Sequence, residues 1–183
     1  MRTRFASDRI AYTGMELSGG WIARNYAMDP PCILSFIGPC RVSPRHMMDI
    51  EDLRAGAQIR ADRMLHFIVE ICDVSIERAV ASQFLLAEVV RDALAAGGVE
   101  ITREGNDLFC GLRKLSVSIA ARGRAGGLIH FGVNVSRGGV PVACAALEDW
   151  AVAPEHFALD AMERFAREME RLERAVRKVR RAG

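Results

Sequence analysis

The residues best suited to chemistry lie between Asn106 and Val135, in two stretches where polar and apolar side chains alternate. Side chains at alternate positions of a β-strand share one face of a sheet. If residues 114–121 and 128–135 are paired strands, we expect their even-numbered side chains on one face and their apolar odd-numbered ones in the core. The polar face would then carry Lys114, Ser116, Ser118, His130, Gly132 and Asn134.

A third alternating stretch, residues 64–72, adds His66 and Glu70 to this face. The combined set offers a cation, two imidazoles for proton transfer, and hydroxyl and amide groups for hydrogen bonds. A glycine inside a strand often marks the close approach of a ligand. An ordinary solvated sheet face is the alternative, but histidine, asparagine and glycine are not its usual residues. We therefore predict a small-molecule site, with Lys114, His66 and His130 as the catalytic candidates.

Lys114 is notable because lysine is rare in this chain. Of 25 basic residues only Lys114 and Lys178 are lysines, and the rest are arginines. A compact ammonium does not replace a planar guanidinium at a specific site. Lys114 is therefore either selected for its chemistry or a chance survivor of the arginine bias, as we expect Lys178 to be.

Three acidic residues, Asp49, Glu51 and Asp52, lie in an irregular stretch between Pro44 and Gly56. Such residues bind a ligand or a divalent metal, here beside His46, or they are solvated or cap a helix. We include the three as ligand-binding candidates and assign no metal site.

The elements that would position these residues follow from hydrophobic periodicity and from turn residues. Long helices are predicted at 76–96 and 154–180, and short ones at 20–27 and 47–55. Strands are predicted at 32–37, 64–72, 99–103, 107–110, 114–121, 128–135 and 140–146. This order predicts a single α+β domain, residues 1–183, with a mainly antiparallel sheet and two long helices.

Composition narrows the class of partner. A net charge of +2 gives no case for nucleic-acid binding, and no apolar run reaches the roughly 18 residues of a membrane span. The first ten residues lack the apolar core of a secretory signal. Five scattered cysteines favour a reducing cytoplasm. We expect a cytoplasmic protein with a small-molecule ligand, no nucleic-acid or membrane partner, and a homodimer as an open alternative.

A family resemblance rests on Arg103, Asn106-Asp107-Leu108, Lys114-Leu115 and Gly132-x-Asn134. These residues look like the R-x-N-D, strand lysine and G-x-N motifs of the catalytic domain of biotin and lipoate protein ligases. Over nearly the whole chain, the strings DIEDLRAG, RMLHFIVE, GNDL, KLSVSIA and HFGVN together resemble an uncharacterised prokaryotic family, domain of unknown function 366.

The resemblance to the ligases implies their α+β fold and a role for Lys114 in contacting an acyl-adenylate, with Asn106 and Asp107 nearby. We include Arg103, Asn106 and Asp107 as ligand-binding candidates. The reaction it implies is activation of an acyl group by ATP, followed by transfer to an amine. The ligases carry a Gly- and Arg-rich adenylate loop upstream of the long helix, whereas residues 41–62 contain no such motif. The similar string at 121–127 is expected to be a hairpin turn. The cofactor therefore stays open, with ATP as the candidate, and a non-catalytic small-molecule-binding or dimeric protein on the same fold is the alternative to an enzyme.

Overall fold

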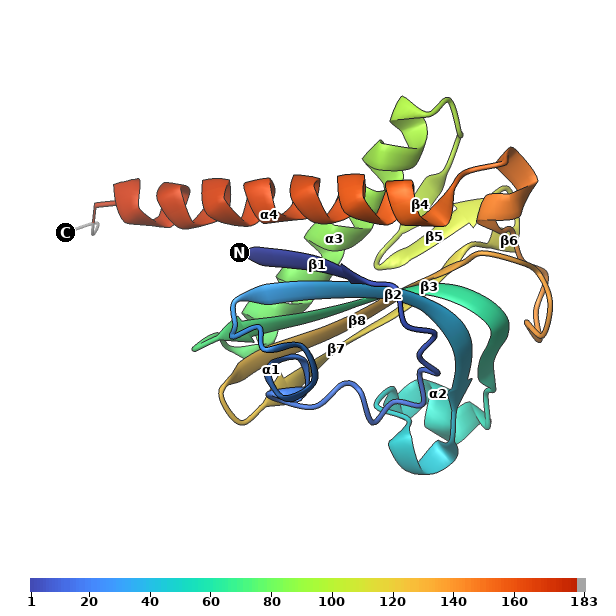
Figure 1. Cartoon of the computed structure of the whole chain (residues 1–183), viewed down its shortest axis with the longest axis horizontal. Coiled ribbons are helices and arrows are strands. Elements are labelled where there is room, and N and C mark those ends of the chain that lie inside the picture. Colours follow the sequence, from blue (N-terminus) through green and yellow to red (C-terminus); the bar gives the residue numbers. More distant parts are fainter. Residues whose placement is uncertain (181–183) are drawn as a thin grey trace.

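The computed structural model describes residues 1–180, which form a five-stranded sheet, a smaller three-stranded sheet and four α-helices (Figure 1). The helices are α1 (Trp21–Tyr26), α2 (Ile50–Ala55), α3 (Ile76–Ala96) and α4 (Pro154–Lys178). The strands are β1 (Arg2–Ala6), β2 (Cys32–Val42), β3 (Ile59–Cys72), β4 (Thr102–Glu104), β5 (Asp107–Cys110), β6 (Arg113–Lys114), β7 (Ser116–Gly123) and β8 (Gly126–Asn134).

The large sheet has the strand order β1-β2-β3-β8-β7, and the small sheet has the order β4-β5-β6. Only the β1–β2 pair is parallel among these ladders. The predicted fold class, α+β with a mainly antiparallel sheet and two long helices, is confirmed. None of the helices within residues 1–180 has the continuous apolar stretch that crossing a bilayer requires.

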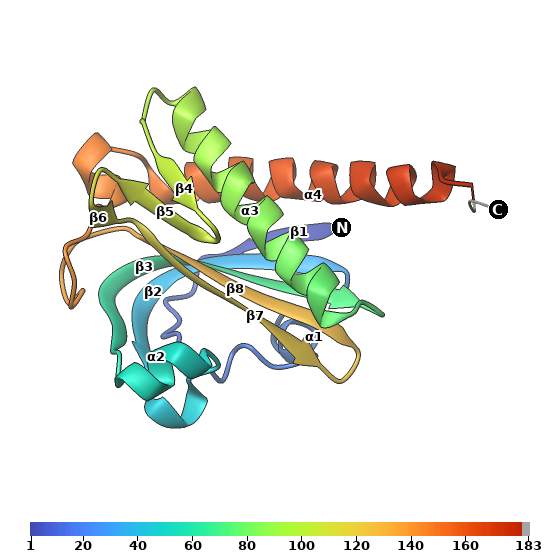
Figure 2. The same cartoon turned by 180° about the vertical axis from the view of Figure 1, so that it is seen from behind.

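Helices α3 and α4 cover one face of the large sheet, as both views show (Figures 1 and 2). The alternating apolar side chains of β3, including Leu65, Phe67 and Val69, are fully buried in this layer. Their burial against α3 follows from the period of two that the sequence displays. The predicted span of α3 agrees with the structure at both ends, with Ser75 as its N-cap.

The opposite face of the large sheet is covered by the segment before β2, which includes α1, and by the excursion between β2 and β3, which carries α2. Ile22 of α1 packs here with Leu34 and Phe36 of β2. Two layers of side chains therefore enclose the sheet, and polar side chains on this face, such as His66 and His130, are buried.

The predicted strand 114–121 is interrupted at Leu115, and this changes which side chains share a face. Leu115 lies between β6 and β7, and its side chain is buried on the helix side. The next side chain, Ser116, also turns to that side, because its Oγ accepts a hydrogen bond from Leu108 N (2.9 Å). Val117 and Ile119 consequently pack on the opposite face. The prediction that Ser116 and Ser118 share a face with His130 is therefore wrong.

Two other predictions about local structure can be settled. Residues 140–146 do not form a strand, and only an isolated bridge between Lys114 and Cys144 lies in this stretch. The Gly- and Arg-rich string at 121–127 is the predicted hairpin turn, since it joins the antiparallel strands β7 and β8.

Glu70 holds α1 against the sheet and does not face an open surface. Its buried carboxylate (3% exposed) accepts hydrogen bonds from Gly20 N at 2.7 Å and from Ile22 N at 2.9 Å. These N–H groups belong to the first turn of a helix, where intrahelical acceptors are lacking. Alternation correctly places Glu70 on the same face of β3 as His66, but its side chain caps α1.

Replacing Glu70 with glutamine is expected to lower the free energy of unfolding by about 1.5–3 kcal/mol, the usual value of hydrogen bonds to a charged group. The NH₂ group of the glutamine is itself a donor and cannot accept from a backbone N–H group, so one of the two hydrogen bonds to α1 is lost. Urea denaturation measures the change. Glu163→Gln, in an exposed pair with Arg167, is the matched control and should change stability by no more than about 0.5 kcal/mol. Equal effects of the two substitutions would contradict the capping role.

Candidate functional site

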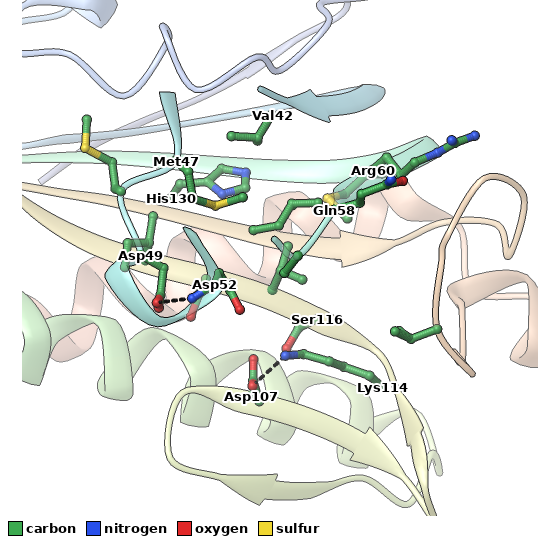
Figure 3. Close-up of a pocket in the computed structure, with 18 of the residues that line it drawn as sticks. Val42, Met47, Asp49, Asp52, Gln58, Arg60, Asp107, Lys114, Ser116 and His130 are labelled. Atoms are coloured by element: carbon green, nitrogen blue, oxygen red, sulfur yellow. Dashed lines mark hydrogen bonds and ion pairs between the residues drawn. The ribbon is translucent and has the colours of Figure 1, made fainter. Parts of the chain in front are cut away.

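A cavity of about 430 Å³ lies on the sheet face opposite α3 and α4, between the sheet and the excursion that carries α2 (Figure 3). Its walls come from β3, β6, β7, β8, the α2 excursion, the turn before β5 and the loop after β8. The apolar side chains on these walls are Val42, Met47, Met48, Ile59, Met64, Val117, Ile119, Val140 and Val142. The volume is in the range of pockets that bind small ligands.

Lys114 and Asp107 form an ion pair at one end of the cavity (Figure 3). Lys114 Nζ lies 2.7 Å from Asp107 Oδ2, and the Lys114 side chain is 32% exposed. The β5–β6 hairpin brings the two residues together, since Lys114 pairs with Phe109 two positions after Asp107. The pair places an ammonium at the cavity with its direction fixed by a carboxylate.

The acidic residues of the α2 excursion face the same cavity but have different tasks. Asp49 is the N-cap of α2 and accepts hydrogen bonds from Glu51 N (2.8 Å) and Asp52 N (3.0 Å). Burial, and next the neighbouring Asp49 carboxylate, raise the pKa of Asp52, while Lys114 acts in the opposite direction. Within residues 1–180 no three His, Cys, Asp or Glu side chains come together as a metal would require.

His130 and His66 form a hydrogen-bonded pair at the sheet surface beneath the cavity. His130 Nε2 lies 3.0 Å from His66 Nδ1, and His66 Nε2 lies 3.3 Å from the Gly38 carbonyl oxygen. His130 lines the cavity, and its ring stacks on Tyr12 with centroids 3.7 Å apart. His66 lies behind it, fully buried. The structure thus brings together the two predicted imidazoles but gives only one of them access to the cavity.

Burial dominates the protonation of this pair. It lowers the pKa of His66 to about 3, against the effect of the hydrogen bond to Gly38. It also holds the pKa of His130 well below its ordinary value, with a smaller contribution from His66. Both rings are therefore neutral at pH 7 and serve as hydrogen-bonding groups.

Several predicted site residues hold the framework together with their polar atoms. Asn106 Nδ2 donates to Ser118 Oγ at 3.0 Å, and that hydroxyl also accepts from Gln83 of α3 at 2.8 Å. Asn134 Nδ2 donates to the Lys114 and Ala145 carbonyls at 3.3 and 3.1 Å. Asn106, Ser116, Ser118 and Asn134 border the cavity, but these bonds tie its walls to each other.

Three other predicted residues do not border the cavity at all: Arg103, Glu70 and Gly132. Arg103 pairs with Glu88 of α3, Nε to Oε2 at 2.7 Å. A Cβ added at Gly132 would lie 2.4 Å from Met64 Sδ, so the space above this glycine is filled by the Met64 side chain. The expectation that Gly132 leaves a gap for a ligand is therefore wrong.

The apolar walls of the cavity, and Tyr12, are absent from the predicted site. Met47 and Met48 lie in an irregular segment without hydrophobic periodicity, and Tyr12 is an isolated aromatic in a loop. Alternation along residues 114–121 places Val117 and Ile119 in the core, and the interruption of the strand at Leu115 turns them toward the cavity instead. An unusual pairing of two methionines beside a histidine is the sole local signal, and it does not indicate a cavity by itself.

Comparison with known proteins gives a family and a fold. A family model described as domain of unknown function (DUF366) matches residues 1–180. A protein of unknown function from Pyrococcus horikoshi is 32% identical, with a TM-score of 0.95 and full coverage of both chains.

The biotin protein ligase of Aquifex aeolicus, in complex with biotin and ATP, is 11% identical, with a TM-score of 0.62 over 91% of this chain and 70% of the ligase. A T. acidophilum protein that is proposed to be a lipoate protein ligase, with bound lipoic acid, is 13% identical, with a TM-score of 0.62 over 93% of this chain and 86% of the other. The predicted likeness to the ligase catalytic domain is confirmed at the level of the fold.

The buried histidine pair predicts a specific dependence of stability on pH. Unfolded histidine has a pKa near 6.5, whereas both native pKa values are lower, so acid protonates the unfolded chain first. The stabilisation that the two neutral imidazoles contribute is present above pH 6.5 and is lost as the pH falls below it. When the pH is lowered from 7 to 5, the free energy of unfolding should therefore decrease by up to about 4 kcal/mol.

Urea denaturation at a series of pH values measures this loss. His156 is exposed on α4, so His156→Gln serves as the control and should leave the pH profile unchanged. A flat profile between pH 7 and pH 5 would show that the buried imidazoles are not held neutral.

Proposed function

We propose that this chain, which belongs to the family described as domain of unknown function (DUF366), binds a small acyl- or nucleotide-like molecule beside Lys114 and transfers its acyl or nucleotidyl group. The observation that carries the proposal is the Lys114 ammonium at one end of a 430 Å³ cavity whose other walls combine polar side chains with methionine, valine and isoleucine side chains. Such a cavity suits a molecule with an oxygen-rich end and an apolar body.

Lys114 stabilises negative charge that develops on acyl or phosphate oxygens during transfer. An ammonium fixed in place before the reaction needs no reorganisation in the transition state. Asp107, 2.7 Å away, fixes its direction. Because the pair is only partly exposed, the ammonium acts in surroundings where water screens it less than at an open surface.

His130 binds the far end of the ligand in this scheme. Burial keeps its imidazole neutral, so it accepts a hydrogen bond from the part of the ligand that lies away from Lys114. His66 supports it from behind through the hydrogen bond between Nδ1 and Nε2. Asn106, Asn134, Ser116 and Ser118 contribute by holding the walls of the cavity in register.

The likeness to ligases indicates which ligands to test first and does not identify the substrate. The Aquifex aeolicus ligase is seen with biotin and ATP, and the T. acidophilum protein with lipoic acid. These ligands combine a carboxylate or phosphates with a compact apolar or heterocyclic part. Because one fold supports many functions, the proposal rests on the cavity and uses the likeness only to choose the first ligands to test.

A non-catalytic small-molecule binder on the same fold is the second candidate. The observation that favours it is the segment Arg41–Asp62, which contains a single glycine, Gly56, and forms the short helix α2. A Gly- and Arg-rich loop would offer backbone N–H groups to phosphates, and this segment has no such loop. Binding of a ligand without turnover of ATP would favour this candidate.

Substituting Lys114 with alanine is expected to abolish ligand binding and turnover and to shift the melting temperature by less than about 4 °C. A partly exposed ion pair contributes no more than about 1 kcal/mol, which corresponds to a few degrees in a chain of this size. Isothermal titration with ATP plus biotin, lipoate or octanoate, and with a non-hydrolysable acyl-adenylate analogue, measures binding.

Lys178→Ala is the matched control, because Lys178 is the one other lysine and lies at the exposed end of α4. It should bind every ligand as the unchanged chain does. A large loss of stability in Lys114→Ala with intact binding would contradict the proposed role, as would equal behaviour of the two variants.

A further inference from the structure

A chain of hydrogen bonds runs from the backbone of β2 to the cavity through both buried histidines. The Gly38 carbonyl oxygen lies 3.3 Å from His66 Nε2, and His66 Nδ1 lies 3.0 Å from His130 Nε2. The start of this chain is fixed by the backbone. A Cβ at Gly38 would lie 1.7 Å from the Ile10 carbonyl oxygen, so only glycine permits the crossing of these segments.

The donors and acceptors in this series of hydrogen bonds determine which ring nitrogens carry a hydrogen. A carbonyl oxygen only accepts hydrogen bonds, so His66 Nε2 carries a hydrogen. In a neutral ring His66 Nδ1 is then bare, and it accepts from a hydrogen on His130 Nε2. His130 is neutral as well, so its Nδ1 has a lone pair and no hydrogen. Burial of both rings, which lowers both pKa values, supports this neutral arrangement.

The bare nitrogen of His130 is accessible only through the cavity. The His130 side chain is 3% exposed and lines the cavity. Tyr12 covers its ring at an interplanar angle of 7°. No hydrogen-bond donor among residues 1–180 reaches Nδ1. Unlike unpartnered atoms such as Ser82 Oγ, Nδ1 is not completely enclosed by protein. Nδ1 is therefore an unpaired acceptor reached from the cavity.

We propose that His130 Nδ1 is a fixed hydrogen-bond acceptor that selects ligands with an N–H or O–H donor, such as a cyclic urea, an amide or an amino-substituted heterocycle. The inference rests on the proposed ligand site and specifies its chemistry. A carboxylate or phosphate oxygen at this position would face a lone pair and is rejected. A neutral donor gains a hydrogen bond that leaves no buried polar group unpaired.

The positions of His130 and Lys114 define a ligand with two different ends. The Lys114 carbonyl accepts from Asn134 Nδ2, and Asn134 follows His130 by four residues on β8. At about 3.3 Å per residue, the Lys114 backbone lies roughly 13 Å from that of His130 along the strand. The oxygen-rich end of the ligand belongs at Lys114 and the donor-bearing end at His130.

The first test needs no ligand. Long-range ¹H–¹⁵N NMR of histidine-labelled protein at pH 7 reports which ring nitrogens carry hydrogens. We expect Nε2 protonated and Nδ1 bare in both His66 and His130. A hydrogen on His130 Nδ1 would make it a donor and overturn the inference, and it would leave the proposed role of Lys114 untouched.

The second test uses two matched probes, imidazolidin-2-one and its 1,3-dimethyl derivative, which differ in their N–H donors. We expect the unsubstituted urea to shift the His130 resonances and the dimethyl urea to bind at least about tenfold more weakly, the equivalent of one hydrogen bond. His46→Gln, a change in another histidine of the same cavity, should keep this preference.

Equal binding of the two ureas, or no shift from either, would overturn the selection by His130. Loss of adenylate binding in Lys114→Ala, by contrast, depends on the other end of the cavity. The urea preference and the adenylate titration therefore fail separately, which distinguishes failure of this inference from failure of the proposed function.

Discussion

The structure depends on the backbone of two residues, Lys114 and Leu115, being shared between three segments of chain. Lys114 N donates to the Ala143 carbonyl and Ala145 N donates to the Lys114 carbonyl, both at 3.0 Å. Leu115 N donates to the Leu108 carbonyl at 2.8 Å, and Asn134 N donates to the Leu115 carbonyl at 3.0 Å. Buried backbone groups must be paired, so this crossing joins the small sheet, the large sheet and the loop after β8. It also places Lys114 at the end of the cavity.

The same constraint separates polar residues that support the framework from those available to a ligand. A buried polar side chain is stable only if it is hydrogen-bonded. Glu70 meets this need by capping α1, and Ser118 by joining Gln83 to Asn106. Lys114 and His130 differ because both line the cavity, where they are available to a ligand.

The family and the fold leave the reaction open, since ligases with the same fold share only 11–13% identity with this chain. The cavity supplies the distinguishing chemistry. One end has an ammonium paired with Asp107, close to Asp52, and the other has a neutral imidazole. The walls also carry three methionine side chains, which adapt to ligands of irregular shape. A ligand that fits must therefore be polar in different ways at its two ends.

The sequence by itself determined the fold class, the span of α3, the β7–β8 hairpin turn and the alternation of β3, because periodicity, caps and glycine turns act locally. The sequence also predicted that His66, His130 and Lys114 share one site, and in the structure His130 and Lys114 line the same cavity. Only the tertiary structure decided the faces of Ser116 and Ser118, since the break at Leu115 arises from pairing with distant strands. The use of Glu70 as a cap and the filling of the space above Gly132 by Met64 were likewise decided there. Each depends on a partner far away in the chain, and periodicity does not record such partners.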